Sequence, residues 1–394
     1  MSDPVVIVSA ARTPMGSFQG TLSPLSTTDL GAVAIKAAVT RAGIAAEDVQ
    51  EVMMGCVLPA GLGQAPARQA AIKGGLPLSA GCTTVNKVCG SGMKTVMLAH
   101  DALLAGSVEI IVAGGMESMT NAPYLLPKAR GGMRMGHGTV VDHMFMDGLE
   151  DAYFDKGGLM GTFAENTADK YAATREEQDA FAIESLNRAR KASETGLFKD
   201  EIEPLTVKHR KGETFVEQDE QPYAVDTSKI PNLRPAFRPD GTVTAASSSS
   251  ISDGAAAVVL MRQSEATRRG LKPLATIKAH ATHSQEPCWF TTAPVGAISK
   301  ALDKAGWTSE DVDLYEINEA FAIVTMAAMK ELNLPHKKVN VHGGACALGH
   351  PIGASGTRLI VTLIHALKQT GGTKGIASLC IGGGEATALA VELI

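Results

Sequence analysis

The stretch that decides the fold is Ala38-Val-Thr-Arg-Ala-Gly-Ile-Ala-Ala-Glu-Asp-Val49, because it returns later as Ala301-Leu-Asp-Lys-Ala-Gly-Trp-Thr-Ser-Glu-Asp-Val312. In both copies a helical pattern ends at Ala-Gly, and after three residues Glu-Asp-Val leads into an apolar run. Glycine is common just beyond a helix C-terminus because it accepts left-handed backbone. The repeat therefore predicts two similar halves, each with a helix followed by a strand.

A second pair of segments repeats in the same order. Cys89-Gly-Ser-Gly92 opens a helix, and the apolar run that follows it, Ile110 to Ala113, is expected to end at Gly114-Gly115. His350-Pro-Ile-Gly-Ala-Ser-Gly356 also opens a helix, and a strand then ends at Gly382-Gly-Gly384. Pairs such as Ala-Gly and Gly-Gly are common, so chance similarity remains the alternative to duplication.

The pattern of apolar residues predicts an α/β protein. Continuous apolar runs alternate with amphipathic helices, which is typical of parallel strands covered on both faces. Residues 119–249 are richer in Met, Gly, Lys and Asp, and they hold one clear helix, with capping-box residues Thr174 and Glu177. We expect a first half of residues 1–118 with 250–270, an inserted loop domain of residues 119–249, and a second half of residues 271–394.

Composition excludes several functional classes. The 394 residues carry a net charge of −5 and only 4% aromatics, so a nucleic-acid binder is not expected. No apolar run reaches about 18 residues, and no signal-peptide pattern precedes Val5, so we expect neither membrane insertion nor export. The six cysteines lack paired metal-ligand spacing, which predicts reduced thiols in a cytoplasm rather than disulfides or a zinc site.

Two residues stand out as chemical candidates. Cys89 lies at a helix start, where the positive end of the helix dipole favours the thiolate. The alternative is a small buried cysteine at a tight turn. His350 lies in residues 343–356, where five of fourteen residues are glycine. A backbone that passes close to a ligand, with histidine as the partner of a nucleophile, explains that composition.

Two further candidates lie at strand ends. Cys380 ends a predicted strand before Gly382-Gly-Gly384, at an edge where open α/β sheets bind ligands. It could serve as a second acid or base, and a buried strand cysteine is the alternative. Asn318 follows the strand 314–317, where it could orient a water or a substrate oxygen, or simply cap a helix over residues 320–332.

Four segments resemble the signatures of the thiolase family, in the family's order and spacing. They are Asn86-Lys-Val-Cys-Gly-Ser-Gly92, Asn318-Glu-Ala-Phe-Ala322, Gly349-His-Pro-Ile-Gly-Ala-Ser-Gly356 and Cys380-Ile-Gly-Gly-Gly384. The similarity covers essentially the whole chain. Within the family, this sequence most resembles the bacterial acetoacetyl-CoA thiolases.

The resemblance implies a layered αβαβα core with mixed sheets, and a carbon–carbon bond-forming and bond-breaking reaction. Cys89 would be acetylated, Cys380 would move the α-proton, and His350 would activate Cys89. A water held by Asn318 would help His350 stabilise an enolate, and the N–H groups of Cys89 and Gly382 would form a second oxyanion hole. The partners implied are acetyl-CoA, acetoacetyl-CoA and coenzyme A, with no permanently bound cofactor and no metal. A homotetramer built as a dimer of dimers is implied as well.

The family's coenzyme A contacts carry over to seven positions, with three departures from the family pattern. Leu159 replaces a common His, Ser247 replaces a usual Asn, and Gln221-Pro-Tyr223 stands where an Arg often holds the nucleotide. The basic run Lys208 to Lys211 could compensate, although a solvated surface turn is the simpler interpretation. The seven positions are Leu149, Met160, Phe237, Ala245, Ser249, Ala320 and Phe321.

Three alternatives remain open from sequence. A 3-ketoacyl-CoA thiolase of fatty-acid oxidation would take longer chains, whereas the bulk of Trp289-Phe290 favours a short acyl pocket. A Cys–His–Asn peptidase has the residue types of Cys89, His350 and Asn318 but explains neither Cys380 nor the duplication. A catalytically silent binding scaffold is disfavoured because all four chemical positions are occupied.

Overall fold

The computed structural model describes residues 3–153, 158–210 and 212–394. Its main sheet is mixed and contains ten strands drawn from both halves of the chain. Those of the first half are β1 (Val5–Arg12), β2 (Gly16–Ser17), β3 (Glu51–Gly55), β4 (Gly81–Val85), β5 (Ile110–Ser118) and β10 (Ser252–Arg262). Those of the second half are β11 (Ala275–Ser284), β12 (Leu314–Ile317), β13 (Lys374–Ile381) and β14 (Glu385–Leu393).

The two halves match strand for strand. The order β4-β3-β5-β10-β1 of the first half corresponds to Val339-β12-β13-β14-β11 of the second, with Val339 forming a single parallel bridge to β12. In both halves the pairs on either side of β3 or β12 are parallel and the rest are antiparallel. A register shift even recurs at the same place, between Ile7 and Ser9 in β1 and between Ile277 and Ala279 in β11. Duplication is confirmed, and the expectation of parallel strands was right for only part of each half.

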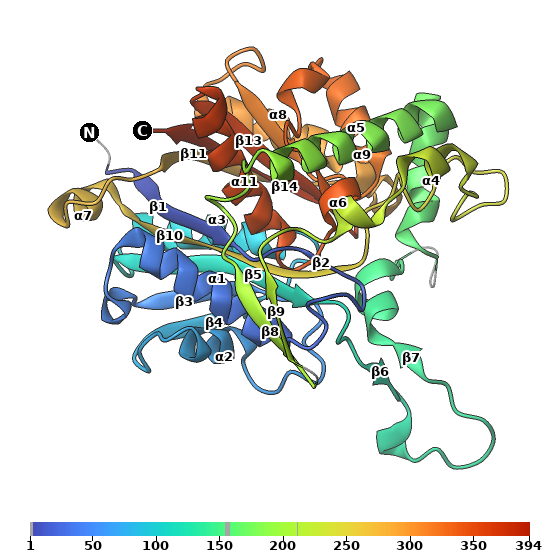
Figure 1. Ribbon diagram of the computed structural model, residues 1–394, viewed down its shortest axis with the longest axis horizontal. Coiled ribbons are helices and arrows are strands. Elements are labelled where there is room, and N and C mark those ends of the chain that lie inside the picture. The colour runs from blue at the N-terminus through green and yellow to red at the C-terminus, as the bar shows by residue number, and fades with distance from the viewer. Residues whose placement is uncertain (1–2, 154–157, 211) are drawn as a thin grey trace.

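The strands of each half form one β layer, joined to the other only by the pairing of Val6 and Ile7 in β1 with β11, and the helices complete the αβαβα layers that the family resemblance implied. Because successive side chains of a strand alternate between faces, Val6 and Val8 of β1 pack with the outer helices, whereas Val5 and Ile7 pack with the central pair, α3 and α11. The outer layers are α1 and α2 over the first half and α8 and α9 over the second (Figure 1). The helices of the two halves are α1 (Thr27–Ala42), α2 (Pro66–Lys73), α3 (Ser91–Leu104), α7 (Gln263–Arg268), α8 (Ala293–Ala305), α9 (Ala322–Glu331), α10 (Ala345–Leu348) and α11 (Ser355–Thr370), with short turns η1 (Ala46–Asp48), η5 (Pro287–Thr292) and η6 (His336–Lys338).

The repeated Ala-Gly stretch forms the structure that the sequence predicted. Helix α1 ends at Gly43 and helix α8 ends at Gly306, and both glycines have φ of 69° in the left-handed region. After each glycine a short connection leads into the parallel strand of its half, β3 or β12. Glycine is favoured at both positions because a β-carbon is strained at this φ.

The central helices α3 and α11 touch at their first turns. A β-carbon on Gly92 would lie 3.0 Å from the backbone N of Thr357, and one on Gly356 would lie 2.3 Å from the backbone N of Met93. Thr357 also donates a 2.8 Å hydrogen bond from its hydroxyl to the carbonyl of Gly92. The glycines therefore let two helix N-termini, one from each half, approach the same point.

The predicted end of a strand at Gly114-Gly115 was wrong, because β5 continues to Ser118. The two glycines are needed for close contact rather than for a turn. A β-carbon on Gly114 would lie 2.3 Å from the carbonyl oxygen of Ala256, and one on Gly115 would lie 2.0 Å from that of Gly353.

The chain between β5 and β10 adds two long helices, not the single one expected. Thr174 and Glu177 do form the predicted capping box at the start of the second. The first starts after Leu159, which provides no side-chain cap, so its sequence carries no start signal. The elements are β6 (Tyr124–Leu125), η2 (Ala129–Gly131), β7 (Val141–Asp142), η3 (Phe145–Leu149), α4 (Met160–Tyr171), α5 (Arg175–Glu194), β8 (Leu205–His209), β9 (Gly212–Val216), α6 (Gln221–Ala224) and η4 (Thr227–Asn232).

Arg12 fastens this added segment to the core. Its fully buried guanidinium donates to both carboxylate oxygens of Asp219, at 2.6 and 2.9 Å, and to Glu201 at 2.6 Å. Such two-point pairing is specific in direction as well as strong. The segment carrying β6 and β7 instead projects from the body, at the lower right of Figure 1. None of the helices in the described ranges combines the length and apolar character needed to cross a bilayer.

Candidate active site

Four of the sequence-predicted chemical residues meet in one largely apolar cavity of about 230 Å³. Cys89 precedes α3, His350 precedes α11, and Cys380 and Gly382 lie at the end of β13 and in the turn after it. The cavity thus lies where the starts of the two central helices meet a strand end. Such convergence of polar groups in an apolar pocket is the usual form of a catalytic site.

The turn before Cys89 is strained and held from several sides. Val88 has φ of 44°, which is unusual for a β-branched residue. Its N–H donates to the side chain of Asn86 at 2.9 Å, and its carbonyl accepts from the hydroxyl of Ser91 at 2.6 Å. Strain of this kind persists only where surrounding contacts enforce it. The result is a sharp turn that presents the Cys89 side chain to the cavity.

The Cys89 thiol is not ionised at rest, contrary to what the helix dipole alone suggested. Burial raises its pKa to about 11, although the N–H groups of Gly382 and of Cys89 itself bond to the sulfur and oppose this. The negative charge of Glu117 raises the pKa slightly further. Sequence reasoning considered the helix start and not the apolar surroundings, whose effect is larger. A base is therefore needed to take the proton.

The turn after β13 explains its three glycines. Gly383 and Gly384 have φ of 93° and 86°, which glycine adopts without strain. The turn joins β13 to β14 and leaves the N–H of Gly382 directed at the Cys89 sulfur. An ion pair between Lys87 and Glu385 ties this turn to the one that carries Cys89. Two N–H donors, from Cys89 and Gly382, therefore lie at the Cys89 sulfur.

His350 is held as a neutral imidazole with a defined tautomer. Its Nδ1 lies 2.6 Å from the hydroxyl of Ser355, which donates its own proton to the carbonyl of Pro351 at 2.9 Å. The hydroxyl must then accept from Nδ1–H, which leaves Nε2 without a proton and able to accept one. Burial, together with the charge of Arg358, lowers the pKa of His350 to about 3. A neutral Nε2 can accept a proton.

Asn318 does not cap a helix, so that interpretation was wrong. Helix α9 starts four residues later, after Phe321. The Asn318 side-chain nitrogen instead lies 3.4 Å from Nε2 of His350, and its backbone N–H bonds to Ser378. Its side-chain oxygen is buried and has no hydrogen-bond partner within the described ranges. The Asn318 side chain therefore lies beside the imidazole of His350, and its oxygen is left to accept a hydrogen bond.

Cys380 is the second thiol of the site and is almost fully buried. Burial raises its pKa well above the ordinary value, and the nearby Cys89 raises it further. Since each thiolate disfavours the other, the two thiols do not ionise together. Their titrations are coupled.

Glu117 was not singled out from the sequence. Its buried carboxylate accepts from the N–H groups of Val57, Leu58 and Gly353, at 2.9, 3.2 and 2.9 Å. Burial raises its pKa to about 7 despite these bonds. A β-carbon on Gly353 would lie 2.6 Å from the carboxylate, which explains that glycine of the His350 loop. Glu117 thus holds the loop that carries His350 in place.

Six of the seven expected coenzyme A contacts line the cavity, and Ala245 does not. Ala245 is exposed on the loop beside it. Ser247 is buried and accepts from the N–H of Thr244 at 2.8 Å, so it shapes this loop instead of facing the cavity. Leu159 does line the cavity, where it adds apolar surface. The six that line it are Leu149, Met160, Phe237, Ser249, Ala320 and Phe321.

Two other hypotheses from the sequence concern the acyl pocket and the basic run of residues 208–211. Phe290 lines the cavity, as its bulk suggested, but Trp289 does not and instead lies against the ammonium of Lys170, 4.4 Å away. In the basic run, Lys208 and His209 are exposed in the β8–β9 hairpin and line no part of the cavity, and Lys211 lies outside the described residues.

Comparison with known proteins gives consistent matches to both parts of the chain. The family described as "Thiolase, N-terminal domain" matches residues 5–264, and "Thiolase, C-terminal domain" matches residues 271–393. An acetyl-CoA acetyltransferase of Chromobacterium violaceum is 52% identical over 390 residues, covering 98% of this chain and 99% of that protein. Acetyl-CoA acetyltransferase 2 of Arabidopsis thaliana is 51% identical, covering 99% of this chain and 97% of that protein.

Two solved structures are similar to this chain over nearly its whole length. A thiolase of Ascaris suum in complex with coenzyme A superposes with a TM-score of 0.94 at 44% identity, covering 99% of this chain and 100% of that one. The acetyl-CoA acetyltransferase of Bacillus anthracis gives a TM-score of 0.97 at 42% identity, covering 100% of this chain and 99% of that one.

Proposed function

Since the chain belongs to the thiolase family, we propose that it is an acetyl-CoA acetyltransferase that cleaves acetoacetyl-CoA with coenzyme A and runs the reverse condensation. The observation that carries this proposal is the single cavity in which two thiols, one neutral imidazole and two N–H donors meet. A hydrolase needs one nucleophile, whereas carbon–carbon cleavage also needs an acid for the departing carbanion. Cys380 meets that second need.

In the cleavage direction His350 Nε2 takes the proton of Cys89, and the thiolate attacks the 3-keto carbon of acetoacetyl-CoA. The bond between C2 and C3 breaks, the acetyl group stays on Cys89, and Cys380 protonates the departing acetyl-CoA enolate at C2. The Cys380 thiolate then takes the thiol proton of free coenzyme A, whose sulfur attacks the acetyl group, and Cys89 leaves as a thiolate that His350 reprotonates. Preorganised donors at Cys89 and Gly382 stabilise the oxyanion of each addition step.

The coupling between the two thiols supports an order of events for condensation. A charged Cys89 opposes ionisation of Cys380. Acetylation leaves the Cys89 sulfur unable to ionise, so no charge there opposes ionisation of Cys380 at the moment when a base is needed at the α-carbon of acetyl-CoA. Asn318, whose side chain lies at His350, would hold a water that helps His350 bind the enolate oxygen.

We place the coenzyme A and acyl site between the added segment, residues 119–249, and the two halves, residues 1–118 with 250–270 and residues 271–394. Supporting this, Leu149, Met160 and Phe237 reach the cavity from the added segment, whereas Ala320 and Phe321 reach it from the second half. Coenzyme A is a substrate and product in this proposal, and no permanently bound cofactor is required.

The deciding assay is coenzyme A–dependent cleavage of acetoacetyl-CoA by the purified protein, followed as loss of enolate absorbance. We expect turnover that requires free coenzyme A, with much slower cleavage of 3-ketohexadecanoyl-CoA. The cavity is smaller than the roughly 300 Å³ at which pockets for drug-sized ligands begin, and the Phe290 ring fills one wall. Equal or faster cleavage of the long substrate would favour a thiolase of fatty-acid oxidation instead.

Changing Ser355 to Ala is expected to lower kcat by about ten- to a hundredfold. The variant removes the acceptor that fixes His350 with a proton on Nδ1, and a hydrogen bond to a group that becomes charged is worth about 1.5–3 kcal/mol. Steady-state rates with acetoacetyl-CoA measure this. The matched control is Ser9→Ala, because the Ser9 hydroxyl is equally buried and bonds to the carbonyl of Ala38 outside the cavity. An equal loss in both variants would make the effect a matter of stability alone.

We propose a homotetramer, a dimer of dimers. The projecting segment around β6 and β7 exposes several large apolar side chains, and β4 lies at the open edge of the main sheet. Both features are usually covered in a stable protein. The exposed side chains include Tyr124, Leu126, Met133, Met135 and Val140.

We therefore expect light scattering at micromolar concentration to give a mass several times that of the 41.0 kDa chain. Met135→Asp should reduce this mass, because Met135 is 99% exposed in the isolated chain and would place a charge in the interface. Ile394→Asp, at an exposed C-terminus, serves as the control. A monomeric wild-type protein contradicts the proposal.

We further propose a cytoplasmic location. All six cysteines are free thiols, and such a set, including the two of the site, persists in a reducing compartment.

A further inference from the structure

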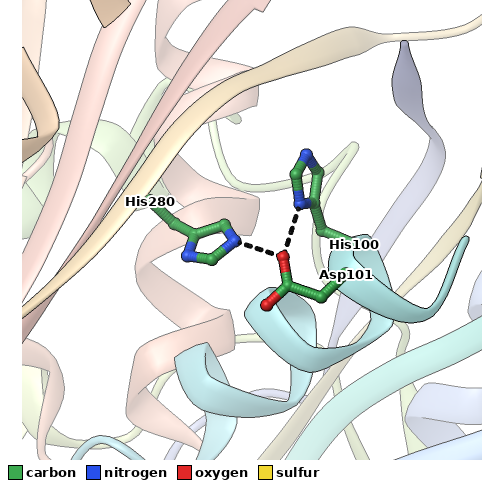
Figure 2. Close-up of side chains that lie close together, drawn as sticks. All are labelled: His100, Asp101 and His280. Carbon is green, nitrogen blue, oxygen red and sulfur yellow. Dashed lines mark hydrogen bonds and ion pairs between the residues drawn. The ribbon is translucent and has the colours of Figure 1, made fainter. Parts of the chain in front are cut away.

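Outside the cavity, one cluster of metal-ligating side chains stands out among the described residues. His100 and Asp101, near the end of α3, meet His280 of β11, and one ligand atom of each lies within 4.8 Å of the others. Figure 2 shows both imidazoles directed at the same oxygen of Asp101. The distances to that oxygen are 3.1 Å from Nδ1 of His100 and 2.9 Å from Nε2 of His280.

These separations are close to those of ligands that share one metal ion. Zinc–nitrogen and zinc–oxygen bonds of about 2.0–2.1 Å place neighbouring tetrahedral ligands about 3.3 Å apart. The two rings stand edge to face, with centroids 5.0 Å apart and an angle of 87° between their planes, so both nitrogens reach one centre without ring stacking. Small movements would admit an ion between the three atoms.

We propose that His100, Asp101 and His280 form a binding site for a divalent first-row transition metal, with Zn²⁺ as the natural occupant. Two imidazoles and a carboxylate suit this class of ion, whereas Mg²⁺ and Ca²⁺ prefer all-oxygen sites. Three protein ligands leave positions open for water. The Asp101 side chain is 55% exposed, so an ion can enter from solvent.

The charges around the cluster agree with this assignment, with one opposing group. The Asp101 carboxylate supplies a negative charge beside the two imidazoles. The C-terminal end of α3 attracts a cation as well. Lys304, which bonds to the carbonyl of His280 at 3.0 Å, repels one.

The site would join the two halves of the molecule. Helix α3 belongs to the first half and β11 to the second, and His280 is separated from Asp101 by 179 positions in sequence. Since a metal bound only by the folded form stabilises it in proportion to occupancy, Zn²⁺ would act as a clip across the interface between the halves. The cluster lines no part of the catalytic cavity, so no role in the chemical step is implied.

The test is a titration of the chelator-treated full-length protein with Co²⁺, whose visible spectrum reports its ligands. We expect one tight equivalent per chain without the thiolate-to-cobalt band that Cys89 or Cys380 would produce. His280→Gln should weaken binding at least about tenfold, the smallest loss typical even of residues that only support metal ligands. Lys304→Met should tighten it, since a nearby positive charge is removed. His137→Gln, an exposed histidine elsewhere, is the matched control.

Thermal unfolding provides the second readout with Zn²⁺ itself. The ion should raise the Tm of the wild type and of His137→Gln and leave that of His280→Gln unchanged. If His280→Gln does not fold, Asp101→Asn answers the same question at a more exposed position. Unaltered Co²⁺ affinity in these variants, a thiolate band, or an equal Zn²⁺ effect on every Tm would overturn the proposal.

Discussion

Replacing Cys89 by serine is expected to reduce thiolytic turnover by at least about a thousandfold while the chain stays folded. The apolar surroundings already hold the pKa of the thiol at about 11, so proton removal by His350 is difficult even for sulfur. A hydroxyl is a far weaker acid than a thiol, and the two N–H donors that favour the sulfur anion cannot make up that difference. Loss of an activated nucleophile costs on the order of 10⁶ in kcat in a serine protease.

The measurement is the steady-state rate with acetoacetyl-CoA and coenzyme A, together with the Tm of each variant. Cys288→Ser is the matched control, because Cys288 is a half-buried thiol that does not line the cavity. We expect that control to keep wild-type activity. If Cys89→Ser retains more than about a tenth of the rate, another group is the nucleophile. Replacing an activated nucleophile should lower the rate far more than that.

Replacing Cys380 by serine is expected to separate the two half-reactions. The variant should still take an acetyl group from acetyl-CoA, because acyl transfer needs only Cys89, His350 and the donors at Cys89 and Gly382. It should lose exchange of the α-protons of acetyl-CoA with deuterium by about 10²–10⁴-fold, the usual cost of a missing base. Condensation should be lost with it.

Mass spectrometry of each variant after mixing with acetyl-CoA detects the adduct, and proton exchange is followed in deuterated buffer. Cys89→Ser should show neither adduct nor exchange, which makes the pair of variants its own control. Two results would contradict this division of labour. They are an absence of acetylated Cys380→Ser protein, and deuterium exchange by that variant at the wild-type rate.

Much of the fold could be predicted because its signals are local. The left-handed glycines after α1 and α8 and the capping box of α5 are each determined by a few neighbouring residues. The errors arise where distant chain segments decide. Gly114 resembles a strand terminator in sequence, yet it lies within β5, where the paired strand β10 brings the carbonyl of Ala256 close to it. No local pattern contains that information.

The residues of the site also fall into those that the sequence revealed and those that it did not. Cys89, His350 and Cys380 were accessible from sequence because each stands among glycines at the end of an element. Glu117 was missed because its partners come from two remote loops, and Ser355 because its role depends on the tautomer of His350. The ionisation of Cys89 was misjudged for a related reason, since burial is a property of the assembled molecule.

The close approach of α3 and α11 at Gly92 and Gly356 carries a consequence for how such a site could arise. Each glycine lies in the first turn of the same helix in one copy of a repeated unit, so Cys89 and His350, which precede these helices, meet at the interface between the copies. One copy alone could build this interface only by pairing with an identical chain, and twofold symmetry would then impose the same residues on both helix starts. Joining the copies in a single chain removes that constraint. One helix start can then keep a thiol and the other an imidazole, so a symmetric framework supports chemistry that requires two unlike partners.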